Sequence, residues 1–242
     1  MIKSLYLTLS FLLFFSTSKA QNWAGGVDDE PFHFGFMFQY ITSDYKIFKK
    51  PDWRNPYLDV ENGKFITDSL YSLDSPPAKG FGIGFVSNMR ISENVDIRFT
   101  PGLSFSDRYI DYNYLDPNKF KQQAVQTTLV DFPLGVKIKS DRLHNFRAYL
   151  LAGGKYSMDI ISKKKTDDSG FALLEKLVKN NSSYLSYEVG VGFDFYFEFF
   201  KLSPELKLSN SIGNVLKAEN HPYSTPLDKL YLHSVQFSLF FE

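Results

Sequence analysis

The sequence predicts an all-β protein, a transmembrane antiparallel up-and-down β-barrel of about eight strands. Apolar and polar residues alternate in segments of about ten residues, from Phe32 to the last segment of the chain. The connections between these segments are alternately long and short. Aromatic residues make up 17% of the chain, yet the mean hydropathy is only −0.23. Together these features indicate a wall that is apolar on one face and polar on the other.

The alternating segments follow one another without a long helical pattern between them, which argues against a βαβ architecture. In the first segment, Phe34, Phe36 and Phe38 alternate with Gly35 and Gln39. The fifth segment is the least regular. Each segment is long enough to cross a bilayer at a tilt, and their even number is typical of single-chain barrels. The approximate ranges are 32–40, 80–85, 95–105, 130–138, 146–156, 186–197, 200–208 and 234–241.

The connections are sorted by length along the chain. Long connections are expected at about 43–77, 107–124, 159–183 and 211–228, and short ones at about 91–94, 140–145 and 198–199. Long extracellular loops on one side and short periplasmic turns on the other are typical of an outer-membrane barrel. A soluble lipocalin-like barrel does not need this sorting.

The N-terminus has the pattern of a cleaved signal peptide over residues 1–20. Lys3 supplies a positive charge, residues 5–15 are apolar, and Ser18-Lys19-Ala20 places small residues at the cleavage site. A membrane-anchoring or buried helix is the alternative, but the run is shorter than the roughly 20 apolar residues that a span needs. We therefore expect export to the cell outer membrane, with a flexible periplasmic leader at 21–31 and a barrel domain at 32–242.

Composition argues against several classes of function. The chain has no cysteine, and its 27 Lys and Arg balance its 27 Asp and Glu, whereas a nucleic-acid-binding protein usually has a basic excess. The four histidines are scattered without metal-ligand spacing, and no G-x-S-x-G motif occurs. We therefore predict no enzyme: no catalytic, cofactor-binding or metal-binding residues, no cofactor, no nucleic-acid partner and no small-molecule substrate.

The polar faces of the segments predict a network of charges inside the barrel. A barrel of about eight strands encloses a lumen that side chains can fill. Because isolated buried charges are costly, charges of both signs on the lumen face are expected to pair. A register slip of one residue would reverse any of these assignments. The predicted lumen residues are Arg98, Asp131, Lys137, Glu188, Asp194, Glu205 and Lys207.

One long connection contains a helical pattern. Phe171, Leu174, Leu177 and Val178 follow Ser169-Gly170 with the spacing of a short amphipathic helix. Such a helix could cap the barrel, or it could contact a partner or the membrane surface. The pattern alone leaves these roles open.

Several stretches resemble the PorT/SprT family. They are residues 32–36, residues 94–103 (NVDIRFTPGL), residues 130–134 (VDFPL) and residues 142–150 (RLHNFRAYL). The most specific block is YEVGVGFDFYFEFFKLSPE at 187–205. The resemblance extends from about Phe32 to Asn214, and it does not cover the patterns of the long connections.

This resemblance implies an outer-membrane β-barrel component of the type IX secretion system of Bacteroidetes, which exports large folded proteins and supports gliding motility in gliding species. The implied partners are outer-membrane lipid and other components of the system, and the implied role is partner binding rather than catalysis. The alternative is a small-solute or ligand-binding outer-membrane barrel unrelated to secretion. That alternative needs an open, hydrated lumen.

Overall fold

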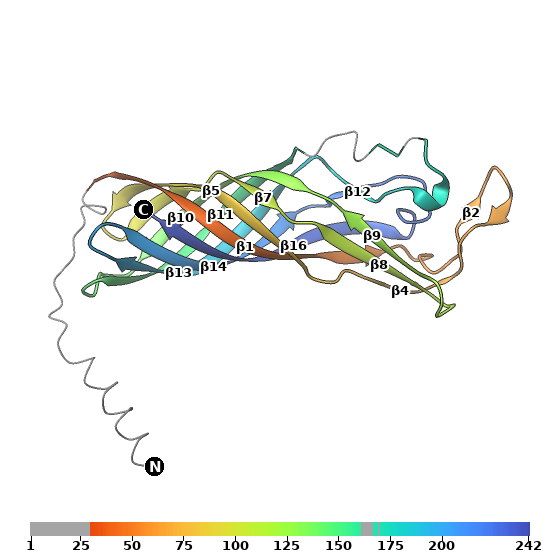
Figure 1. Cartoon of the computed structure of the whole chain (residues 1–242), viewed down its shortest axis with the longest axis horizontal. Coiled ribbons are helices and arrows are strands. Elements are labelled where there is room, and N and C mark those ends of the chain that lie inside the picture. Colours follow the sequence, from red (N-terminus) through yellow and green to blue (C-terminus); the bar gives the residue numbers. More distant parts are fainter. Residues whose placement is uncertain (1–29, 161–166, 169) are drawn as a thin grey trace, which may run out of the picture.

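The computed structural model of the chain describes residues 30–160, 167–168 and 170–242. The predicted signal peptide at 1–20, and the predicted leader except for its last two residues, lie outside the described residues. The described chain forms an elongated barrel with the last strand ending at the same end as the start of the first (Figure 1). Short turns lie at this end, called here the short-turn end, and longer segments lie at the opposite long-loop end.

Within the described residues, the wall is a closed ring of eight antiparallel strands, as the sequence predicts. β6 and β7 are two halves of one wall strand, since both pair with β5 and with β10. β1 pairs with β5 on one side and with β16 on the other, which closes the ring. The wall elements are β1 (Phe32–Lys49), β5 (Ala78–Ser92), β6 (Val95–Phe99), β7 (Gly102–Phe105), β10 (Thr128–Lys139), β11 (Phe146–Asp159), β13 (Ser183–Tyr196), β14 (Lys201–Ile212) and β16 (Leu227–Phe241).

Alternation along each strand decides which side chains point outward. In β1, Phe34, Phe36 and Phe38 are exposed on the outer wall, whereas Met37 and Gln39 are buried inside. Aromatic side chains on the outer wall also contact one another across neighbouring strands. Phe36 and Phe241 stack with ring centroids 5.1 Å apart at the β1–β16 seam. Such cross-strand aromatic pairs stabilise a sheet in addition to its hydrogen bonds.

The wall continues beyond the predicted strands at the long-loop end. The sequence predicts loops at 43–77 and 107–124, but β1 runs to Lys49, and β4, β8 and β9 form a second sheet that prolongs the barrel (Figure 1). Their alternation is hard to read from the sequence because their outer faces meet water and carry polar residues. In β8, Ile110 and Tyr112 are buried while Asp111 and Asn113 face outward. The remaining elements here are β2 (Leu58–Asp59), β3 (Lys64–Phe65), β4 (Leu70–Asp74), β8 (Arg108–Tyr114), β9 (Phe120–Val125), β12 (Lys179–Asn180) and β15 (Leu216–Lys217).

The predicted amphipathic helix is wrong in the described part of its segment. A single 3-10 turn, η1 (Leu173–Glu175), occupies it, and the residues on both sides of η1 are extended. Phe171 and Leu174 are exposed, Leu177 is half-buried, and Val178 is buried in the core. The helical spacing failed because the Asp168 carboxylate binds the Leu177 N–H at 2.8 Å and fixes a different backbone path. None of the helices in the described part of the chain has the length and hydropathy needed to cross a membrane.

Candidate functional site: the filled lumen and the exposed long-loop end

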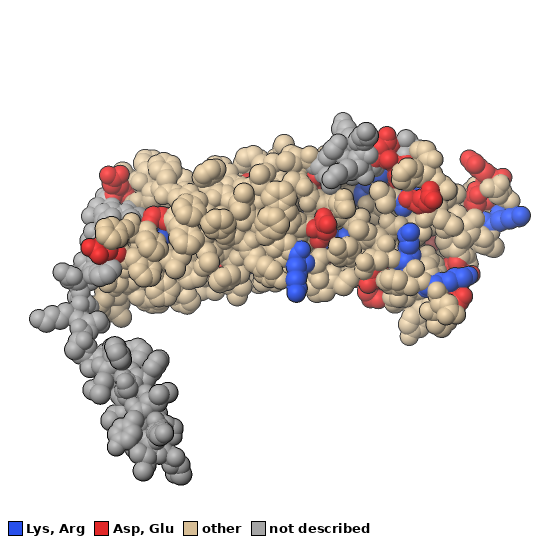
Figure 2. Space-filling view, in the orientation of Figure 1, with Lys and Arg blue, Asp and Glu red and all other residues tan. Residues whose placement is uncertain are grey.

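The outer wall carries a continuous apolar belt. Figure 2 shows a broad uncharged surface between a few charged groups at the short-turn end and many at the long-loop end. Phe34 and Phe85 are each 72% exposed on this belt. A surface of this kind is stable against hydrocarbon, and the closed ring pairs the backbone groups that hydrocarbon cannot solvate.

The lumen nearest the short-turn end is organised around Arg98. Its guanidinium lies 2.9 Å from the Glu205 carboxylate and 3.4 Å from that of Glu242. Its Nε donates to the Asn88 side-chain oxygen at 2.8 Å. The Tyr149 hydroxyl donates to Glu205 at 3.0 Å. Every one of these groups is buried, so Arg98 and its partners form a desolvated network in which the charges are compensated.

A second ion pair completes this layer. The Lys137 ammonium donates to both oxygens of Asp194, at 2.8 and 2.7 Å, and the Ser203 hydroxyl donates to the same carboxylate at 2.6 Å. Lys201 lies 3.0 Å from Glu242 and so joins this group to the Arg98 network. Three cations therefore face three carboxylates across this end of the lumen.

A further layer of paired charges lies along β10, β11, β13 and β14. Glu188 lies between two ammonium groups, that of Lys155 at 3.1 Å and that of Lys207 at 3.0 Å. Asp131 instead accepts two hydroxyl hydrogen bonds, one from Ser104 and one from Ser157, each at 2.6 Å. The carboxylates on these strands are thus satisfied by groups from neighbouring strands.

The structure places all seven predicted lumen residues inside the barrel, each at most 4% exposed. It brings together Arg98 with Glu205, Lys137 with Asp194, and Lys207 with Glu188, while Asp131 bonds to hydroxyls. The prediction omitted the lumen residues Asn88, Tyr149, Lys155, Lys201 and Glu242. Continuing the same alternation through the irregular fifth segment and past Phe241 would have found Tyr149, Lys155 and Glu242.

The lumen at the long-loop end is filled by an apolar core instead. The connection between β14 and β16 folds inward here, so that Val215, His221 and Tyr223 are buried. The Tyr112 hydroxyl donates to the Tyr223 carbonyl at 2.5 Å and ties this connection to β8. The core cluster comprises Tyr45, Leu70, Leu73, Ile110, Tyr112, Val125, Leu129, Val178, Tyr184, Val215, Leu216, Tyr223, Leu227, Leu230 and Leu232.

The charged layers leave little free space around Arg98. The cavity beside Arg98 and Glu205 measures about 10 Å³, which is at the lower limit for a single water molecule. Within the described residues, no group of three or more His, Cys, Asp or Glu is arranged to hold a metal ion. The charged part of the lumen is therefore a packed core.

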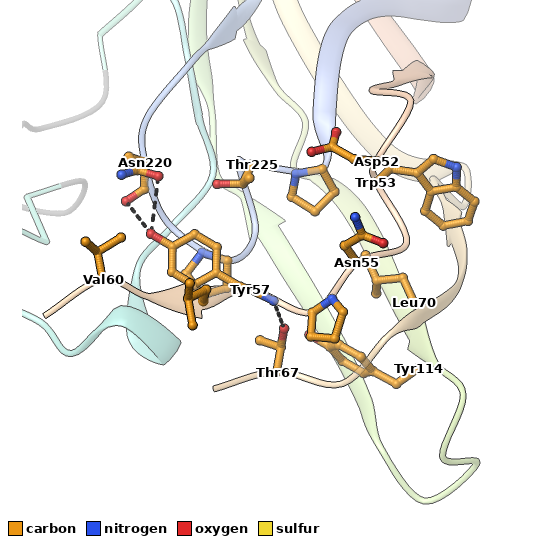
Figure 3. A pocket seen from close by; sticks show the side chains of 14 residues that line it. Asp52, Trp53, Asn55, Tyr57, Val60, Thr67, Leu70, Tyr114, Asn220 and Thr225 are labelled. Atoms are coloured by element: carbon orange, nitrogen blue, oxygen red, sulfur yellow. Dashed lines mark hydrogen bonds between the residues drawn. The ribbon is translucent and has the colours of Figure 1, made fainter. Parts of the chain in front are cut away.

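One pocket at the long-loop end has a volume of about 190 Å³ (Figure 3). It lies between the chain that follows β1, the start of β4, the end of β8 and the β14–β16 connection. The Tyr57 hydroxyl forms one wall and donates to the Asn220 side-chain oxygen at 3.2 Å. Burial raises the pKa of Tyr114, on the opposite wall, to about 12, so this phenol is neutral at physiological pH. The pocket thus offers aromatic rings, amides and the Asp52 carboxylate to a ligand.

The hairpin of β2 and β3 projects beyond this pocket (Figure 1). Three of its apolar side chains are exposed, Leu58 at 44%, Val60 at 82% and Phe65 at 67%. Single exposed apolar residues are common, but a projecting group of them is typical of a protein contact site.

The closed ring, the apolar belt and the polar lumen together define a β-barrel protein of the outer membrane. Residues 3–217 match the family model described as Outer membrane protein beta-barrel domain. The chain belongs to this family.

Solved structures with a similar arrangement are outer-membrane proteins of low sequence identity. OprG from Pseudomonas aeruginosa has 13% identity and a TM-score of 0.44, with 86% of this chain and 94% of that one covered. Neisserial surface protein A has 13% identity and a TM-score of 0.39, with 87% and 98% covered. AlkL has 12% identity and a TM-score of 0.39, with 87% of each chain covered. A search of curated protein sequences finds no match.

Proposed function

We propose that this barrel is a component of the type IX protein secretion machinery, and that it acts by binding partner proteins rather than by catalysis. The observation that carries the proposal is the filled lumen. Ion pairs occupy one end and an apolar core occupies the other, and the cavity beside Arg98 and Glu205 is too small for a solute or for exported cargo.

The resemblance of residues 187–205 to the PorT/SprT family supports the choice of machinery. This block forms β13, the turn after it and the start of β14. It supplies Glu188, Asp194 and Glu205 to the lumen network, so the residues that carry the resemblance also help to close the barrel.

The exposed β2–β3 hairpin is the proposed contact with other components of the machinery. Leu58, Val60 and Phe65 project from the long-loop end, where their side chains are exposed. Burial of such side chains against a partner stabilises a complex by about 25 cal/mol for each Å² of apolar surface removed from water.

The test is a secretion assay on a strain that lacks this gene, with cargo measured in the culture medium and in the periplasm. Cargo with type IX signals is expected to accumulate in the periplasm, and the wild-type gene is expected to restore its release. The double variant Val60→Asp with Phe65→Asp should assemble in the outer membrane without restoring secretion. Tyr71→Asp is the matched control, because Tyr71 is also exposed, at 67%, but lies on β4 outside the hairpin.

Normal release of cargo by the deletion strain would contradict the proposal. Altered uptake of a small solute together with normal secretion would support a solute or ligand-binding barrel in its place. If the hairpin variant restores secretion as well as Tyr71→Asp does, the hairpin is not the contact.

A further inference from the structure

A groove of about 420 Å³ opens on the outer wall where two wall strands separate. The β14–β16 ladder ends at the pair Asn210–His233. One residue further, the Leu232 N–H donates at 2.9 Å to the Ser211 hydroxyl rather than to a backbone carbonyl. The divergence of the two strands beyond this point leaves the hollow.

A row of polar side chains on neighbouring strands lines the groove. Asp44 on β1 pairs in register with His233 on β16, His233 with Asn210 on β14, and Asn210 with Tyr187 on β13. All four line the groove. The His233 Nδ1 lies 2.9 Å from the Asp44 carboxylate. Four adjacent strands therefore present hydrogen-bonding groups outward along one row of register partners.

Apolar residues lie on both sides of this row. Toward the short-turn end, the next outward row contains Val235, Leu208 and Val189, which are also in register. Toward the long-loop end, Ile212 is 61% exposed and Leu185 is 55% exposed. Placing a polar group against acyl chains costs free energy unless the group is hydrogen-bonded. His233 and Asp44 satisfy part of this row through each other, and a polar ligand could satisfy the remaining groups.

The rim of the groove adds a cation and aromatic rings. The rings of Phe48 and Tyr231 meet edge to face, with centroids 5.4 Å apart. The Lys46 ammonium lies 5.5 Å from the centroid of the Phe48 ring. An ammonium and an imidazole are donors suited to a phosphate, while a carboxylate and an amide accept from sugar hydroxyls. The ring faces can pack against the C–H groups of a sugar.

We propose that this groove binds the headgroup of an outer-leaflet glycolipid, a phosphorylated sugar that carries acyl chains. Lys46 and His233 contact the phosphate, and Asp44 and Asn210 contact the sugar hydroxyls. The acyl chains lie along the apolar row toward the short-turn end. This assignment goes beyond the secretion role and does not depend on it.

The experiment uses the purified mature protein in phosphatidylethanolamine nanodiscs, with lipid A added as the probe and bound lipid measured by native mass spectrometry. Phosphatidylglycerol, which is anionic but has no sugar, is the comparison lipid. We expect lipid A to bind preferentially, and the double variant Lys46→Met with Asn210→Leu to bind it roughly tenfold more weakly, as expected for loss of a charge-assisted contact. Lys121→Met, on β9 in the separate β4–β8–β9 sheet, is the matched control and should bind as the wild type does.

Equal binding of lipid A and phosphatidylglycerol would overturn the proposal, as would equal binding of lipid A by the double variant and by Lys121→Met. A heat-dependent gel shift checks that each variant is a closed barrel. A photo-crosslinker at position 231 in cells provides a second readout. Crosslinks to glycolipid support the proposal, and crosslinks to a protein alone assign the groove to a membrane partner instead.

Discussion

At the scale of single residues, the lumen depends on close fits around a few large side chains. Arg98 has its guanidinium carbon 4.6 Å from the centroid of the Phe240 ring and 5.1 Å from that of Tyr149, in addition to its carboxylate partners. Tyr149 in turn lies over Gly192 on the neighbouring strand. Removing one member of a buried ion pair costs about 3–5 kcal/mol, because the remaining charge stays buried without compensation.

Gly192→Ala is expected to destabilise the barrel. A Cβ at this position would lie 2.3 Å from the Tyr149 ring, so Tyr149 must move away from Glu205. Overpacking of this kind costs about 1–3 kcal/mol. Urea unfolding in detergent micelles measures the difference. Gly154→Ala is the control, since a Cβ there meets only the Ser186 carbonyl oxygen at 3.8 Å, and equal losses in both variants would show that the Tyr149 fit is unimportant.

At the scale of elements, the connection between β14 and β16 acts as a plug. His221 in this connection is 2% exposed, and its Nδ1 accepts the Tyr223 N–H at 3.3 Å. Nε2 therefore carries the proton of the neutral ring. Burial lowers the pKa of His221, because a charged imidazole is poorly solvated there. Folding of the plug thus favours neutral His221.

The plug is expected to loosen in acid. The folded pKa lies below the unfolded value of about 6.5, so unfolded chain binds more protons and stability is lost as the pH falls below about 6.5. Hydrogen exchange of residues 213–226, corrected for intrinsic rates, should rise between pH 7.5 and pH 5. His221→Leu should remove this dependence, and its persistence in that variant would assign the effect to other groups.

The predictability of the elements follows from what each outer face meets. β1 and β16 alternate between lipid and lumen, so large apolar and polar residues mark their two faces plainly. The outer face of β8 meets water, so Tyr109 and Asp111 disguise the alternation of buried Ile110 and Tyr112. The plug has no periodic pattern, because Val215, His221 and Tyr223 are buried by a tertiary fold that local sequence does not encode. The groove required the knowledge of which strands are neighbours.

At the scale of the whole molecule, the barrel is closed twice. The ion-paired layers and the apolar layer lie in series along the axis, and β10 and β13 contribute side chains to both.

The purified protein is therefore expected to give no conductance steps in a planar lipid bilayer. Replacing residues 214–226 with a short Gly-Ser linker should also give none, because Arg98, Lys137 and their carboxylates still fill the lumen. Steps in the linker variant alone would show that ions pass the charged layers. Steps in the wild type would support the solute-channel alternative.

The seam between β1 and β16 governs how such a wall can form at all. Its partners Phe36 and Phe241 come from opposite ends of the barrel sequence, so this seam is the pairing with the greatest sequence separation in the ring. Until this seam forms, two strand edges carry unpaired peptide groups that the hydrocarbon core of the bilayer cannot solvate. A half-built ring is thus unstable in the bilayer. During biogenesis, either an assembly factor must cover those edges or the ring must close while the chain inserts into the membrane. The β1–β16 seam is the place where such a factor would be released.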